Sequence, residues 1–116
     1  MSEFTEVFKA EEIENGQMRS VSIRNRDVLI AKADNQIFAA SDICPHLKGR
    51  LSRGTLEGTV VTCPRHGSKF DLRDGHVVQW TDWSGFILAA SKVLKTPRSL
   101  ETYPVKVEQG KILVEV

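Results

Sequence analysis

The sequence predicts a mostly β fold. Short runs rich in valine, isoleucine and other strand-favouring residues recur along the chain, and pairs of Asn, Asp and Gly that suit tight turns lie between them. At 116 residues the chain is long enough for one hydrophobic core and too short for two substantial domains. No internal repeat or flexible linker interrupts the pattern, so we expect residues 1–116 to form a single domain.

Six segments carry the strand pattern. In chain order, the expected strands are residues 18–24, 28–33, 36–40, 59–63, 105–107 and 111–116. The expected turns contain Asn15-Gly16, residues 25–27, Asp34-Asn35, Gly54, Asp74-Gly75 and Gln109-Gly110. Residues 28–31 and Ile37-Phe38 flank Asp34-Asn35, and this arrangement predicts a β-hairpin with a short turn.

Two other stretches have helical character. Residues 10–14 suit a single helical turn that ends at Asn15-Gly16. Apolar residues recur at three- and four-residue steps over 85–95, with Ser84 as an N-cap and Pro97 beyond the end. We therefore expect one short helical insertion within residues 80–100.

Composition excludes several classes of protein. The chain is 41% hydrophobic and 27% charged, with a net charge of +1, so nothing in the overall charge favours nucleic acid or an anionic membrane. Acidic residues interrupt the first 16 positions, and no run reaches the roughly 18 apolar residues of a membrane span. These features predict a soluble, cytoplasmic protein without a signal peptide.

Two Cys/His pairs form a motif that indicates metal binding. Cys44 precedes His46 by a gap of one residue, and Cys63 precedes His66 by a gap of two. Two loops can therefore each present one sulfur and one nitrogen to a metal. A disulfide between the only two cysteines would leave the histidines unexplained and is disfavoured in a reducing cytoplasm. Structural zinc held by the same four residues is a second alternative.

The flanking residues extend the motif to Cys44-Pro45-His46-Leu47 and Cys63-Pro64-Arg65-His66-Gly67-Ser68, followed by residues 69–71. This pattern resembles the Rieske family, in which two cysteines hold one iron of a [2Fe–2S] cluster and two histidines hold the other. The resemblance covers residues 4–116. It implies one cluster per chain and an antiparallel β-sandwich with a small cluster-binding subdomain, whose loops span residues 42–71.

Further residues are expected to surround the ligands and shape the two loops. These neighbours are Pro45, Leu47, Gly49, Pro64, Gly67, Ser68 and Phe70. The prolines restrict the backbone directly after each cysteine, and the glycines permit its close approach to sulfur. Ser68 matches a serine that accompanies high-potential clusters in the family, whereas Phe70 stands in place of their tyrosine. The resemblance therefore implies a low-to-intermediate reduction potential.

Basic residues are concentrated around the motif. Residues 44–73 contain Lys48, Arg50, Arg53, Arg65, Lys69 and Arg73 against Glu57 and Asp71. They form either a solvated rim or a cationic collar that docks an acidic partner.

The resemblance is greatest to the small ferredoxins of bacterial ring-hydroxylating dioxygenase systems. It implies a one-electron carrier, not an enzyme with its own organic substrate, which takes electrons from a reductase and passes them to a terminal oxygenase. These redox partners are expected to dock near His46 and His66, with no role for nucleic acid or membrane. The alternatives are a small Rieske-like subunit of a reductase such as nitrite reductase and a structural zinc-binding module.

Overall fold

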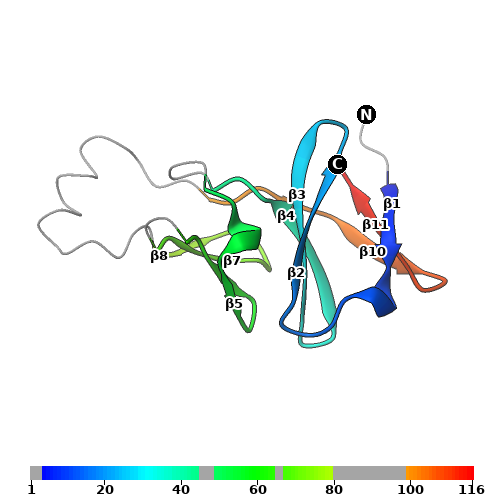
Figure 1. Ribbon diagram of the computed structural model, residues 1–116, viewed down its shortest axis with the longest axis horizontal. Coiled ribbons are helices and arrows are strands. Elements are labelled where there is room, and N and C mark those ends of the chain that lie inside the picture. Colours follow the sequence, from blue (N-terminus) through cyan, green and yellow to red (C-terminus); the bar gives the residue numbers. More distant parts are fainter. Residues whose placement is uncertain (1–3, 45–48, 65–66, 80–98) are drawn as a thin grey trace, which may run out of the picture.

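The protein consists of three antiparallel β-sheets, which confirms the mostly β prediction. The computed structural model describes residues 4–44, 49–64, 67–79 and 99–116. Figure 1 shows the three sheets in a row, with the sheet that contains β2, β3 and β4 in the middle. The sheet formed by β5 to β8 lies on one side of it, and β1, β10 and β11 lie on the other. The expected β-sandwich with a small subdomain is therefore present.

The strands are short, and most pair with a neighbour in the sequence. The first sheet has the order β1 (Phe4–Lys9), β11 (Lys111–Glu115) and β10 (Val105–Glu108). The middle sheet has the order β2 (Met18–Ile23), β3 (Arg26–Ala33), β4 (Gln36–Ser41) and β9 (Thr102–Tyr103). The subdomain sheet has the order β5 (Thr55–Glu57), β6 (Val60–Thr62), β7 (Lys69–Asp71) and β8 (Val77–Gln79).

Two-residue turns set the register of three hairpins. The predicted hairpin is β3–β4, in which Ala33 pairs with Gln36 across Asp34-Asn35. Both turn residues have positive φ, 53° and 61°, as the mirror-image turns that match strand twist require. Arg24-Asn25 and Gln109-Gly110 also have positive φ at both positions, and they connect β2 to β3 and β10 to β11. Asn, Asp and Gly tolerate this conformation best. The predicted turns at Asp34-Asn35 and Gln109-Gly110 therefore lie where the structure has them.

Strand β3 is buried on both faces. Val28 and Ile30 belong to one hydrophobic cluster, which also contains Ile112 and Val114 of the first sheet. Leu29 belongs to a second cluster, shared with the subdomain. Because successive side chains of a strand point to opposite faces, one apolar run fills both cores. The middle sheet is therefore the layer to which the other two sheets attach.

Sequence analysis missed several strands and located the helical turn only approximately. Strands β1, β5, β7, β8 and β9 were not predicted, because most are two or three residues long and depend on pairing with a neighbour. Residues 10–14 contain a short 3₁₀ helix, η1 (Ala10–Glu12). The helix expected over 85–95 falls outside the described residues. Within the described part of the chain, no helix has the length and apolar character needed to cross a membrane.

Gly75 provides a test of the packing between the subdomain and the chain segment that returns to the sandwich. Its N–H donates to the Asp71 carbonyl at 2.7 Å, and its own carbonyl accepts from the Leu100 N–H at 2.8 Å. Its φ is +82°, and a Cβ at this position would lie 2.0 Å from the Leu100 carbonyl oxygen.

We expect Gly75→Ala to lower the free energy of unfolding by about 2–5 kcal/mol, because left-handed strain and a steric clash add together. Gly16→Ala is the matched control, since Gly16 has φ +89° and open space where a Cβ would lie. The control should lose only the strain, about 1–2 kcal/mol. Denaturant unfolding measures both values, and equal losses would contradict the clash.

Candidate metal centre

The structure buries the two cysteines in one hydrophobic cluster. Cys44 lies just after β4 and Cys63 lies between β6 and β7, and their exposed fractions are 0% and 3%. Both share the cluster with Leu51 and Phe70. They are not linked in a disulfide, so the disulfide alternative is not supported. His46 and His66, together with Pro45 and Leu47, lie outside the described residues.

The first ligand loop is closed at its base by backbone pairing. The Cys44 N–H donates to the Gly49 carbonyl at 2.8 Å. One residue further from the tip, Ile43 and Arg50 form an isolated antiparallel bridge. The two residues that flank the loop are therefore held together, and Gly49 is buried beside the cysteine.

The second ligand loop is closed in the same way. The Cys63 N–H donates to the Ser68 carbonyl at 2.7 Å, and β6 pairs with β7 directly below. Gly67 has φ +73°, and its N–H donates to the Cys63 carbonyl at 3.2 Å. The turn itself therefore uses the Gly67 N–H. Glycine is favoured here because the left-handed conformation is costly for other residues.

Both loops thus share one design, in which the N–H of the cysteine binds the carbonyl five residues later, from 44 to 49 and from 63 to 68. Each hairpin holds one soft sulfur donor inside the subdomain core. Thiolate sulfur is the ligand type that iron–sulfur clusters use, and here two separate backbone segments each bring one thiol into the same core. The residues that the structure describes therefore fit the sulfur half of such a group.

The expected neighbours of the ligands that the structure describes differ in burial. Ser68 and Phe70 are fully buried, whereas Pro64 is exposed. A pocket of about 320 Å³ opens beside Cys63. Its walls are formed by Arg53, Gly54, Thr55, Thr62, Cys63, Pro64 and Gly67.

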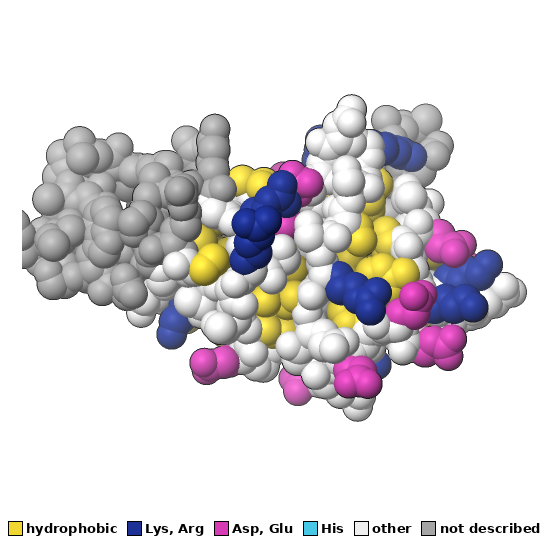
Figure 2. Space-filling model, in the orientation of Figure 1, with side chains coloured by type: hydrophobic (Ala, Val, Ile, Leu, Met, Phe, Trp, Pro, Cys, Tyr) yellow, Lys and Arg dark blue, Asp and Glu magenta, His cyan; other side chains and the backbone are white. Residues whose placement is uncertain are grey.

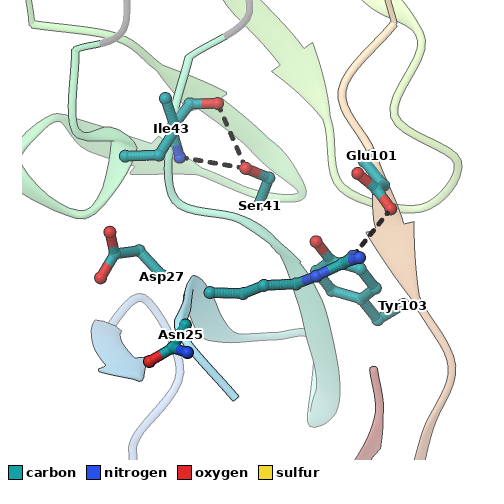
Figure 3. Close-up of a pocket in the computed structure, with 7 residues that line it drawn as sticks. Asn25, Asp27, Ser41, Ile43, Glu101 and Tyr103 are labelled. Carbon is teal, nitrogen blue, oxygen red and sulfur yellow. Dashed lines mark hydrogen bonds and ion pairs between the residues drawn. The ribbon is translucent and has the colours of Figure 1, made fainter. Parts of the chain in front are cut away.

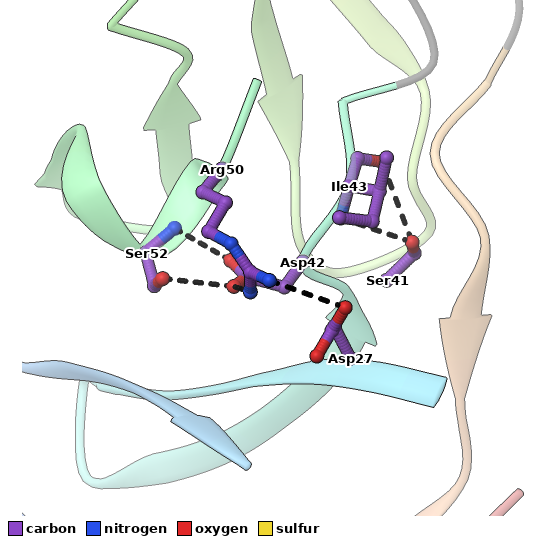
Figure 4. Close-up of polar contacts among 6 residues, drawn as sticks. All are labelled: Asp27, Ser41, Asp42, Ile43, Arg50 and Ser52. Atoms are coloured by element: carbon purple, nitrogen blue, oxygen red, sulfur yellow. Dashed lines mark hydrogen bonds and ion pairs between the residues drawn. The ribbon is translucent and has the colours of Figure 1, made fainter. Parts of the chain in front are cut away.

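Sequence analysis missed Asp42, which is fully buried two residues before Cys44. Its carboxylate accepts hydrogen bonds from the Ser52 N–H at 2.7 Å and the Ser52 hydroxyl at 2.9 Å. Arg50 also contacts it, at 3.3 Å, and reaches Asp27 on β3 at 3.4 Å, as Figure 4 shows. Buried carboxylates need such partners, but only the fold shows which residues supply them.

A polar pocket of about 390 Å³ lies at the junction of the sandwich and the first ligand loop (Figure 3). It is lined by Asn25, Arg26, Asp27, Ser41, Ile43, Glu101 and Tyr103. The Ser41 hydroxyl accepts from the Ile43 N–H at 3.2 Å, a local turn that leads the chain from β4 into the loop. Arg26 pairs with Glu101 at 3.6 Å across the pocket.

Some of the basic residues around the motif form ion pairs with acidic residues of the same chain. Arg50 is bound to two carboxylates, and Arg73 pairs with Asp71 at 2.7 Å. Arg53 is exposed, and Lys48 and Arg65 lie outside the described residues. Figure 2 shows Lys and Arg side chains together with acidic side chains on the subdomain, and mixed charges on the sandwich as well. The count of basic residues therefore overstates the positive charge available to a partner.

Asp71 is a buried carboxylate at the end of β7. Hydrogen bonds from the Arg73 side chain lower its pKa from 3.8 to about 2, although burial acts in the opposite direction. Further hydrogen bonds from the Arg73 N–H and the Thr59 side chain act in the same direction as the guanidinium. The ionised pair holds the turn after β7.

Comparison with known proteins identifies relatives over nearly the whole chain. The family model described as Rieske [2Fe-2S] domain matches residues 3–104. The chain is 31% identical over 116 residues to the biphenyl dioxygenase ferredoxin subunit of Pseudomonas sp. (strain KKS102), covering 97% of this chain and 91% of that protein. It is 27% identical over 108 residues to the ferredoxin component of the naphthalene 1,2-dioxygenase/salicylate 5-hydroxylase systems of Ralstonia sp., covering 91% and 88%.

A solved structure agrees in fold. The chain matches one chain of the complex of reduced oxygenase and oxidized ferredoxin in carbazole 1,9a-dioxygenase with a TM-score of 0.77 and 26% identity. The match covers 95% of this chain and 99% of that chain.

The Asp71–Arg73 pair predicts a specific pH dependence of stability. Because the pKa of Asp71 is lower in the folded protein than its ordinary value, the pair stabilises the fold above about pH 4, and the contribution is lost as the pH falls toward 2. We expect Arg73→Gln to cost about 1 kcal/mol at pH 7, because the Arg73 side chain is largely exposed and the hydrogen bonds from the N–H of residue 73 and from Thr59 remain. In denaturant unfolding, the difference between wild type and variant should shrink between pH 4 and pH 2.

Lys106→Gln is the control, since it removes an ion pair with Glu108 whose two side chains are about half exposed. Such pairs contribute about 0–1 kcal/mol. A wild-type advantage over Arg73→Gln that stays constant down to pH 2 would contradict the role assigned to Asp71.

Proposed function

Because the chain belongs to the Rieske [2Fe–2S] domain family, we propose that it passes single electrons from a reductase to the terminal oxygenase of a ring-hydroxylating system. The family match over residues 3–104 is the observation that carries this proposal. The cofactor is a Rieske [2Fe–2S] cluster, and the protein is an electron carrier of the ferredoxin type. Structural zinc in the same site is disfavoured by this membership.

We propose that Cys44 and Cys63 hold one iron, and that His46 and His66 hold the other. When bound, the cluster supplies a centre that accepts and returns one electron at a time. The two buried hairpin bases support the sulfur assignment, since both thiols are in the same core and neither is in a disulfide. The histidine assignment comes from the sequence motif alone.

The residues of the chain itself have a passive but necessary role. Burial of Cys44 and Cys63 excludes water from the thiolates, and low local polarity strengthens their electrostatic attraction to a metal. The backbone bonds at the base of each loop hold the sulfurs in place before and after electron transfer. A site that moves little on reduction transfers electrons with little reorganisation.

Oxygenase and reductase are the partners we propose. The relatives are ferredoxin components of dioxygenase systems, and the matched solved structure is a complex of an oxygenase with a ferredoxin. We place the docking surface near His46 and His66 and the protein in the cytoplasm, with residues 1–116 as one domain. No specific observation favours the alternative of a reductase subunit.

Reconstitution tests the function directly. The purified holo-protein should be reduced by a flavin-containing reductase of a dioxygenase system and reoxidised by the matching oxygenase, both followed by its visible absorption in stopped flow. Turnover of the oxygenase should depend on added holo-protein. If the reduced protein transfers no electrons to any Rieske oxygenase offered, the partner assignment is wrong, whereas the cluster assignment would still stand.

The proposed ligands predict which substitutions remove the cluster. We expect Cys63→Ser and His46→Gln to lack most iron and acid-labile sulfide, because a single missing donor opens the coordination of one iron. His76→Gln is the control, since His76 lies beyond the motif, is exposed and pairs with Asp74 at 2.6 Å. Iron and sulfide assays and the EPR signal of the reduced protein measure the outcome. Full cluster content in Cys63→Ser would contradict the ligand set.

A further inference from the structure

Asp42 holds together two parts of the molecule that are distant in sequence. Its N–H donates to the Asp27 carbonyl on β3 at 2.9 Å, and its own carbonyl accepts from the Leu51 N–H at 2.8 Å. Its side chain binds Ser52 through both the N–H and the hydroxyl. Leu51 and Ser52 belong to a 3₁₀ helix, η2 (Leu51–Arg53), which directly follows the first ligand loop. The sandwich and the far side of the loop are therefore connected through one residue.

Arg50 adds a second connection across the same junction. One terminal nitrogen of its guanidinium lies 3.3 Å from Asp42, and the other lies 3.4 Å from Asp27. Its backbone forms the bridge with Ile43 that closes the loop. The side chain thus spans from the closing bridge of the loop to strand β3 of the middle sheet. Figure 4 shows Arg50 and Ser52 on one side of Asp42, and Asp27 on β3 on the other.

The chemistry of these contacts favours a geometric role for Arg50. A guanidinium presents its N–H groups in a rigid planar fork, so it can hold two carboxylates at fixed positions at once. A lysine ammonium carries the same charge but lacks the fork. Asp42 is fully buried, and a buried carboxylate with fixed partners has little freedom to move. Asp27 and Arg50 are partly exposed, each with a side chain that is 39% exposed.

We infer that Asp42 and Arg50 are positioning residues, which lock the first ligand loop to strand β3 and thereby set where Cys44 is held relative to Cys63. The inference rests on the proposed function, because it takes Cys44 as an iron ligand. Neither residue touches the cluster in this account, and both act through the backbone of the loop. Loss of the Arg50 side-chain contacts with Asp42 and Asp27 should loosen the loop and change the environment of the cluster. The sandwich should stay folded, because its own core lies on the other face of β3.

The test compares Arg50→Gln and Arg50→Lys in the full-length holo-protein. Both variants should release iron to a chelator about two- to tenfold faster than wild type, because the ion pairs of Arg50 with Asp42 and Asp27 are lost or misplaced. Both should also change the EPR g values of the reduced cluster and increase hydrogen exchange in a peptide that contains Cys44 and Leu51. Asp27→Asn should accelerate release less, and should add little in the Arg50→Gln background, since the two residues act through one contact.

The matched control is Arg26→Gln. Arg26 is the neighbour of Asp27 at the start of β3, and it also forms an ion pair, but with Glu101 at 3.6 Å instead of with a residue of the ligand loop. Its iron release and EPR spectrum should match those of wild type. Thermal unfolding of the three arginine variants should be similar, which separates positioning from a general loss of stability.

Three outcomes would overturn the inference. Wild-type iron release and g values in Arg50→Lys would mean that charge alone suffices. Equal acceleration in Arg26→Gln would mean that any lost ion pair at this end of β3 has the same effect. Unchanged hydrogen exchange around Cys44 in Arg50→Gln would mean that the loop does not depend on the Arg50 side-chain contacts. Failure of the proposed ligand set is distinguishable, because the Cys63→Ser protein would then keep its full content of iron and sulfide.

Discussion

Burial of strand β3 on both faces is the constraint on which the rest of the structure depends. Its alternating side chains complete the sandwich core through Val28 and Ile30, and the subdomain core through Leu29 and Ala31. Each fully buried aliphatic side chain contributes about 1.5–3 kcal/mol. The metal-binding subdomain therefore does not stand alone, since its core is completed by a strand that belongs to the sandwich.

The two ligand loops are closed by the same type of backbone hydrogen bond. In each, a cysteine at the start of a hairpin loop donates its N–H to the carbonyl five residues later, which leaves the thiol inside the core. Ordering of donors before the metal arrives lowers the entropy cost of binding. Asp42 and Arg50 then connect the first loop to β3, whereas the second loop is held by the pairing of β6 with β7.

Much of this architecture could be predicted because it depends on local chemistry. The hairpin at Asp34-Asn35 follows from residues that tolerate positive φ, and the strands between residues 18 and 40 follow from runs of strand-favouring residues between turn signals. The short strands of the subdomain could not be predicted in this way. A segment such as Lys69–Asp71 is a strand only because it pairs with β6 and β8. Arg50 was counted among the basic residues of a solvated rim or a cationic collar, and the fold pairs it with two carboxylates.

Ligand chemistry is a property of the side chains, so the donor types, the spacing of the two Cys/His pairs and hence the family could be recognised from the order of the residues alone. That order also determined the tight turns, since these need specific residues at adjacent positions. Only the tertiary structure decided that both thiols share a core with Phe70, and that Asp42 and Arg50 link the first loop to Asp27. Those contacts join residues far apart in the chain, and no local pattern encodes which of many polar groups will meet.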